Sequence, residues 1–260
     1  MIGINQKTAP PLGRNALPSL NGKTRPPLDR RTVLELNRPG GGAGYVREAG
    51  TPVRAPAGPA VPPPPQAPAV KPVPPLARPL RKGQKTPLQF QDPRSRRLRA
   101  CFGWNVKDSR CDIDASAFLV DASGRVPDDG WFVFYGQTGS PDGSVTFSED
   151  PGGMDREVIQ VDLERLDPSI QKIVFVLTIN EAFAQGLDFS MLRDVYVRLL
   201  DGASDRELLS YRLEEYFETV TSITVGELYL YNGQWKFNPV GNGLHQDLAG
   251  QCAVYGVEIC

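Results

Sequence analysis

The sequence lacks long apolar runs. Its longest apolar stretch, residues 173–179, falls far short of the roughly 20 residues that a membrane-spanning helix needs. The residues after Met1 turn polar and proline-rich at once, without the apolar core of a secretory signal. We therefore expect a soluble protein in the cytoplasm.

Histidine and paired cysteines are also scarce. His245 is the one histidine, and the four cysteines, Cys101, Cys111, Cys252 and Cys260, contain no Cys-x-x-Cys pair. A zinc site draws on such clustered ligands, so none is expected. Two disulfides are one interpretation of the four cysteines. Free, buried thiols are the other, and a reducing cytoplasm favours them.

Motifs of catalysis are missing as well. The sequence has no serine elbow, no P-loop and no Gly-x-Gly-x-x-Gly, and His245 alone offers little for acid–base chemistry. Asp112 and Asp114 form a carboxylate pair, but no apolar residues near them in the sequence indicate a raised pKa. We expect a protein that is not an enzyme.

Acidic residues are rare in the first 100 residues and abundant afterwards. The first 100 residues hold 18 Lys+Arg, four Asp+Glu and 20 of the 25 prolines, whereas the remaining 160 hold 11 basic and 26 acidic residues. A stretch so broken by proline and so poor in aromatic residues buries too little apolar surface to offset chain entropy. We predict a disordered, proline-rich basic arm over residues 1–100 and a folded domain over residues 101–260.

The arm carries signals for contacts with partners. Residues 62–65 and 71–75 favour polyproline II, and residues 54–59 resemble an SH3 ligand. A basic cluster follows at Arg94, Arg96, Arg97 and Arg99. One interpretation is contact with an anionic surface, a membrane or a nucleic acid, although no aromatic residue is interleaved for base stacking. The other is a solubilising linker that contacts the protein's own acidic domain.

From Cys101 onward the apolar residues alternate with period two, and turn signals recur every 10 to 15 residues. This pattern is typical of an all-β, two-sheet β-sandwich, here with one or two short helices. The strands expected are residues 116–121, 131–135, 145–147 returning as the partner of 131–135, 159–163, 173–179 in a central position, and 195–199. Short helices are expected at residues 181–185 and 244–255.

A hairpin over residues 226–237 is the most specific structural prediction. Asn232-Gly233 is the preferred pair for a two-residue type I′ turn. That turn sets Leu230 opposite Trp235 and Leu228 opposite Phe237, so that both apolar pairs share one face.

Two groups of acids suit a hard cation. Asp112 and Asp114 are two residues apart at the start of an apolar strand and therefore project from one face. Residues 148–157 form a loop with four acids and two glycines, which can turn backbone carbonyls inward. Calcium needs about six to eight oxygen ligands, and together these segments offer them.

Several motifs in order resemble the TerD-type tellurium-resistance family over about residues 102–256. They are residues 102–104 (FGW), 112–119 (DIDASAFL), 132–135 (FVFY), 140–145 (SPDGSV), 157–163 (EVIQVDL), 172–176 (KIVFV) and 226–229 (GELY). The resemblance implies a calcium-binding β-sandwich from a bacterial stress-response system linked to tellurite, phage and colicin tolerance. It further implies a binding or scaffold protein, with protein partners in a stress-response complex and no catalytic activity or small-molecule substrate.

The resemblance also assigns a weak calcium site. Asp112 and Asp114 match the family's paired aspartates, and Asp155 with Glu157 matches the acidic end of its second loop. We expect Glu149 or Asp150, which neighbour this loop's acids in the sequence, to assist.

The sequence departs from the family pattern in that second loop. The loop is short, and Arg156 stands where the family has an aspartate, a change of two charge units close to the proposed ion. Gly136 and Gln137 replace asparagines after the aromatic strand. The competing interpretation is a metal-free structural adaptor that uses Arg156 as an internal counter-ion and is recruited to a larger assembly through its basic arm.

Overall fold

The computed structural model describes residues 70–258, apart from residues 93, 151 and 217. The disorder predicted for residues 1–69, the polyproline stretch 62–65 and the SH3-like motif 54–59 lie outside the described residues.

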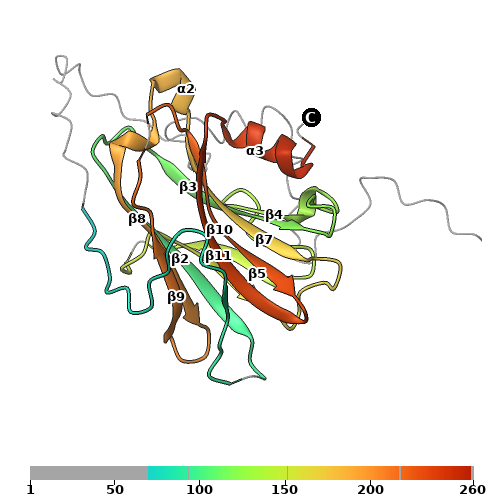
Figure 1. Cartoon of the computed structure of the whole chain (residues 1–260). Helices are drawn as coiled ribbons and strands as arrows, with labels where there is room; N and C mark the ends of the chain where they lie inside the picture. Colours follow the sequence, from blue (N-terminus) through green and yellow to red (C-terminus); the bar gives the residue numbers. More distant parts are fainter. Residues whose placement is uncertain (1–69, 93, 151, 217, 259–260) are drawn as a thin grey trace, which may run out of the picture.

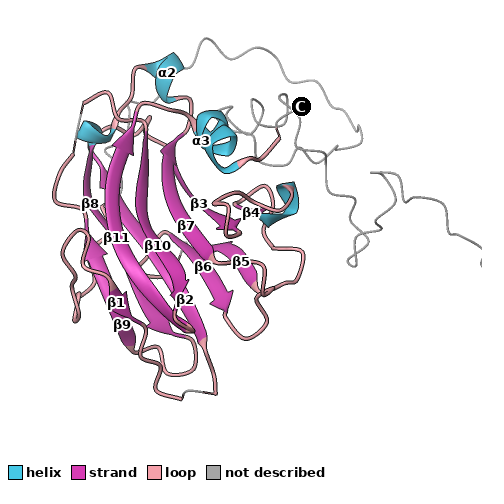
Figure 2. Ribbon diagram, turned by 45° about the vertical axis from the view of Figure 1, so that its right-hand side comes forward, coloured by secondary structure: helices cyan, strands magenta, loops and turns pink. Residues whose placement is uncertain are grey.

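Two antiparallel sheets pack face to face and confirm the predicted β-sandwich (Figures 1 and 2). The six-stranded sheet has the order β1 (Thr86–Pro87), β11 (Gln234–Leu244), β10 (Ser222–Tyr231), β7 (Lys172–Ile179), β3 (Ile113–Val120), β4 (Phe132–Val133). The five-stranded sheet has the order β5 (Val145–Glu149), β6 (Glu157–Asp162), β2 (Arg97–Val106), β8 (Leu192–Asp201), β9 (Glu207–Arg212).

Short helices occupy one end of the sandwich. α2 (Ala182–Gln185) and α3 (Leu248–Tyr255) lie at the same end in both views (Figures 1 and 2). Asp247 is the N-cap of α3, and its side chain accepts a hydrogen bond from the Gly250 amide. Single 3-10 turns are η1 (Asp129–Trp131) and η2 (Phe189–Met191). Among the described residues no helix is long and apolar enough to cross a membrane.

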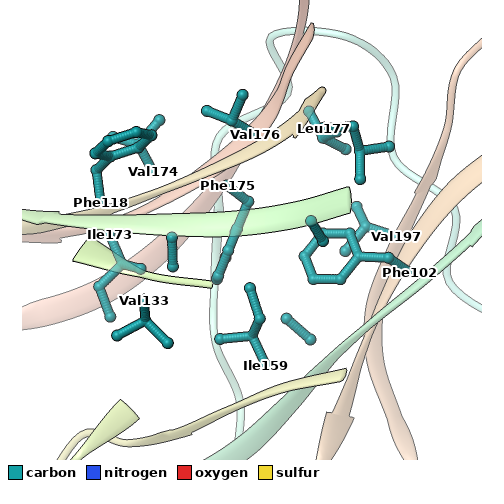
Figure 3. Packing of buried hydrophobic residues seen from close by; sticks show 14 of the residues in the cluster. Phe102, Phe118, Val133, Ile159, Ile173, Val174, Phe175, Val176, Leu177 and Val197 are labelled. Carbon is teal, nitrogen blue, oxygen red and sulfur yellow. The ribbon is translucent and has the colours of Figure 1, made fainter. Parts of the chain in front are cut away.

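The core lies between the two sheets. The rings of Phe102 on β2 and Phe175 on β7 meet at 5.5 Å between centroids, and Ile159 and Val197 lie beside them (Figure 3). β7 is flanked by β10 and β3 and is buried along almost its whole length, as predicted for the apolar run at residues 173–179.

The predicted hairpin is confirmed in every pair. Leu230 lies opposite Trp235 and Leu228 opposite Phe237. Asn232 and Gly233 both adopt positive φ angles, 50° and 73°, as a type I′ turn requires.

The boundary predicted at residue 101 is wrong, because residues 70–100 that the structure describes belong to the domain. β2 begins at Arg97 and lies in the middle of its sheet, between β6 and β8. β1 pairs with β11, and the Leu80 amide donates to the Ser210 carbonyl at 2.8 Å. Composition averaged over 100 residues concealed the local alternation of Leu98, Ala100 and Phe102, which are all buried.

The strand predicted at residues 131–135 is also wrong in part. Asp128 caps the 3-10 turn η1 there, and only Phe132 and Val133 extend as β4. β4 pairs with β3, whereas residues 145–149 form β5 and pair with β6 in the other sheet. Two apolar segments joined by a turn can lie on facing sheets as well as in one hairpin, and the sequence pattern is the same for both.

The basic cluster before Phe102 contacts the domain itself. Arg97 pairs with Asp162 at 3.0 Å and Arg99 with Asp205 at 2.6 Å. Of the four cysteines, Cys101, Cys111 and Cys252 are free and buried, as the thiol interpretation predicts, and Cys260 is not described.

Candidate functional site: an acidic corner between two edge strands

The predicted acids meet where an edge of each sheet comes together. β4 ends the six-stranded sheet, β5 ends the five-stranded sheet, and the two strands contact each other. Because β4 has only two residues, the first part of β3 has no strand partner on that side within the described part of the chain. The carboxylate of Glu157 fills this gap and accepts a hydrogen bond from the Ala115 amide nitrogen at 2.6 Å.

Four carboxylates lie in this region and interact electrostatically, and we call them the acidic corner: Asp112, Asp114, Glu149 and Glu157. Glu149 lies directly opposite Glu157 in the β5–β6 ladder. Asp112 precedes β3 and Asp114 is its second residue.

Burial, together with nearby like charges, raises the pKa of two carboxylates in the acidic corner. Burial, followed by the charges of Asp112 and Glu149, raises the pKa of Asp114 to about 7. Glu157 is 8% exposed, and burial together with the charge of Asp114 holds its pKa well above the usual range. The hydrogen bond from the Ala115 amide lowers this pKa but does not outweigh the other two effects. The sequence near Asp114 gave no indication of a raised pKa, and for this residue that expectation is wrong. Of the two charges that contribute, Asp112 is two residues away and Glu149 is distant in the sequence.

Neutral oxygens lie beside the acidic corner. The Nδ2 of Asn180 donates to Asp112 Oδ2 at 3.3 Å, while its Oδ1 is buried and has no hydrogen-bond partner among the described residues. Ser116 Oγ, two residues after Asp114 on the same face of β3, is likewise buried and unpartnered. Burial, with the charges of Asp114, Asp112 and Glu157, raises the pKa of Tyr135, so its hydroxyl stays protonated at neutral pH.

These oxygen atoms are of the chemical type that calcium binds. Carboxylates and an orphaned amide oxygen are the ligands that a hard cation takes. However, within the described part of the chain no group of three or more acidic, cysteine or histidine side chains lies close enough together to hold a metal ion. The acidic corner therefore offers suitable oxygens without assembling them around one point.

Two predicted ligands lie elsewhere. The carboxylate of Asp155 is 4% exposed and accepts two hydrogen bonds from Arg198, at 2.9 and 2.7 Å, and one from the Tyr196 hydroxyl at 3.0 Å. Asp155 and Asp150 line a cavity of about 260 Å³ on the five-stranded sheet, together with Arg99, Arg198 and Glu149 of the acidic corner. Asp155 is thus already neutralised and is not grouped with Asp112 and Asp114.

Arg156 lies against Trp104. Its Nε donates to the Trp104 carbonyl at 2.7 Å, and its guanidinium carbon lies 6.0 Å from the centre of the Trp104 ring. The counter-ion of Asp155 is Arg198, which the sequence did not single out. Its one signal was a charged residue in the middle of the apolar strand 195–199.

Taken together, the fold and the site define an antiparallel β-sandwich domain with an acidic corner at the edge between its two sheets. The chain belongs to the TerD family, whose model for the TerD domain matches residues 76–255. The match begins before residue 101, in agreement with the described strands β1 and β2.

Relatives of this chain are named for tellurium resistance and general stress. It is 36% identical over 186 residues to the tellurium resistance protein TerD of Serratia marcescens, covering 69% of this chain and 97% of that protein. It is 35% identical over 188 residues to general stress protein 16U of Bacillus subtilis (strain 168), covering 69% and 97%. The crystal structure of a homologue of telluride resistance protein (TerD) from Streptomyces coelicolor A3(2) aligns with a TM-score of 0.48 at 23% identity, covering 60% of this chain and 94% of that one.

Proposed function

We propose that this protein is a non-enzymatic, calcium-binding stress-response protein that acts as a binding or scaffold module. The observation that carries the proposal is the convergence of Asp112, Asp114, Glu149 and Glu157 on one corner between the sheets. Membership of a family whose relatives are named for tellurium resistance and stress supports the biological setting.

In this proposal calcium relieves repulsion that the fold imposes. Four carboxylates in a partly buried corner repel one another, and burial together with this repulsion raises the pKa of Asp114 and Glu157. A divalent cation would supply the missing positive charge, with Asn180 Oδ1 as a neutral ligand. The ligands come from β3 on one sheet and β5 and β6 on the other, so the ion would tie the two sheets at their edge.

Thermal unfolding of the full chain tests this function. A ligand that binds only the folded state stabilises it by mass action, so calcium should raise the melting temperature by several degrees. The variant Asp112→Asn/Asp114→Asn should lose this shift.

The charge-matched control is Glu164→Gln/Glu218→Gln, which neutralises two exposed acids outside the acidic corner. It should keep the full calcium shift. Equal shifts in the two double variants would refute a role for the acidic corner.

A metal-free adaptor is the second candidate, and one observation favours it. No described group of three acids is assembled as a metal site. In this account residues 1–69 recruit the domain to a larger assembly, and calcium plays no part.

Deleting residues 1–69 distinguishes the two functions, since the described domain begins after them. The adaptor predicts that the shortened chain loses partner capture from lysate and that calcium shifts the melting temperature of neither chain. The calcium-binding module predicts that the shortened chain keeps the full calcium shift. If the arm binds an anionic surface, the full chain should bind DNA or anionic vesicles with affinity that falls steeply with salt. Binding that does not change with salt would exclude that kind of contact.

A further inference from the structure

The residues just before the family match lie against the loop between β5 and β6. Lys71 is held there by its backbone: its amide donates to Asn105 Oδ1 at 2.9 Å, and Asn105 Nδ2 donates back to the Lys71 carbonyl at 2.9 Å. Asn105 is 3% exposed and also donates to Asp194 at 3.2 Å. A buried side chain therefore fixes this segment as a neighbouring strand would.

The side chain of Lys71 ends among backbone carbonyls of the loop. Its ammonium donates to the carbonyl oxygens of Asp150 at 2.9 Å, Gly153 at 3.1 Å and Asp155. An ammonium has three donors, so these three acceptors satisfy it completely.

The loop is folded so that these carbonyls converge. The Asp150 amide donates to the Arg156 carbonyl at 2.8 Å, and the Gly153 amide donates to the Asp150 carbonyl at 3.3 Å. A Cβ at Gly153 would overlap the Asp150 carboxylate, so a larger residue there would displace that side chain. Converging carbonyl dipoles repel one another unless a cation sits between them.

We propose that this loop is a cation site that the chain fills with its own Lys71 ammonium. The ligand class is a primary ammonium, supplied in cis. Residues 70–75 then form a strap that the ammonium fastens to the edge of the five-stranded sheet. Lys71 lies outside residues 76–255, so the strap is a feature of this chain beyond the family domain.

The arrangement accounts for the way in which the loop at residues 148–157 departs from the TerD family pattern, which has a longer loop with an aspartate at the position of Arg156. With Lys71 among its carbonyls and Asp155 bound to Arg198, the loop has its positive charges from within the chain. The inference rests on the contacts of Lys71 and does not depend on calcium at the acidic corner.

Amide hydrogen exchange on the full chain tests the proposal, read at Asp150, Gly153 and Arg156. Lys71→Ala should accelerate exchange at these amides by at least about tenfold, because the carbonyls that the ammonium held would separate. The matched control is Lys82→Ala, which removes an ammonium bound to a single carbonyl, that of Gly241 at 3.0 Å. It should leave the loop unchanged.

Chemical rescue then identifies the ligand class. Ethylammonium added to Lys71→Ala should restore slow exchange, whereas tetramethylammonium at the same ionic strength, which has no N–H donor, should not. Unchanged exchange in Lys71→Ala would overturn the strap. Equal effects of the two ions, or rescue by calcium alone, would overturn the ammonium site.

A second variant guards against general unfolding. If Lys71→Ala also accelerates exchange in the β10–β11 hairpin, Lys71→Met keeps the aliphatic stem and removes only the donors. Slow loop exchange in Lys71→Met would overturn the proposal, and fast exchange confined to the loop would support it.

Discussion

At the scale of single residues, the chemistry of this protein depends on which acids have found a positive partner. Asp155 has Arg198 and Tyr196. Asp114 has other carboxylates as neighbours and a pKa of about 7. One acidic residue is therefore part of the packed structure, and the other is available to a cation.

The raised pKa of Asp114 predicts how stability depends on pH. A carboxyl whose pKa rises from 3.8 to about 7 on folding binds its proton more tightly in the folded state, so stability falls as pH rises from about 4 to 7. Without calcium, Asp114→Asn should therefore be more stable than the parent at pH 8, by about 1–2 kcal/mol after discounting for solvent screening. At pH 4 the two proteins should be equal.

Urea denaturation at the two pH values measures this difference, with Glu164→Gln as the control for an exposed acid. If Asp114→Asn and the parent have the same stability at both pH values, folding does not raise the pKa of Asp114.

The Asp155–Arg198 pair predicts an asymmetric double-mutant cycle. Arg198→Met leaves a buried carboxylate without its counter-ion and should cost about 3–5 kcal/mol of unfolding free energy. Asp155→Asn in the same chain should recover part of that loss, since the unpaired charge is gone.

Arg97→Met is the comparison for an exposed pair. Arg97 is 63% exposed in its pair with Asp162, and the substitution should cost less than about 1 kcal/mol. A loss for Arg198→Met as small as that for Arg97→Met would mean that the buried pair does not hold the loop.

At the scale of elements, the sequence predicts best where one local signal decides the outcome. Asn232-Gly233 fixes its hairpin because few residue pairs adopt two successive positive φ angles, and α2 ends at Gly186 as expected. The segment at 131–135 fails because a cap from Asp128 and pairing with β3 decide its structure, and β3 is distant in the chain.

Gly233→Ala tests the hairpin. Alanine at a φ of 73° is strained and should cost about 1 kcal/mol, seen as a lower melting temperature. Gly139→Ala is the control, because its φ is not positive and an added Cβ would meet nothing closer than 3.9 Å. Equal losses at the two positions would show that the turn is not the cause.

At the scale of the whole molecule, the acidic corner depends on the contact between the edge strands of the two sheets, β4 and β5. The sequence identifies all four acids of the acidic corner, since charged residues beside apolar strands are visible without a structure. It cannot tell that Asp155 faces Arg198, or that Lys71 reaches the loop, because both contacts join segments more than 40 residues apart.

The extent of the domain gives a prediction at this scale. A chain of residues 70–260 should unfold as cooperatively as the full chain, whereas a chain of residues 101–260 lacks β1 and the first part of β2 and should lose its cooperative transition. Circular dichroism during heating distinguishes the two. Cooperative unfolding of residues 101–260 would contradict the structural boundary.

The most direct test of the central claim is calcium titration calorimetry of the full chain at pH 7, repeated in two buffers with different protonation enthalpies. With a pKa of about 7, Asp114 is partly protonated at this pH, and calcium entering the acidic corner should release those protons, so the measured heat should differ between the buffers. Asp112→Asn/Asp114→Asn should give no binding heat. Binding heat that is the same in both buffers and survives in that double variant would contradict the account.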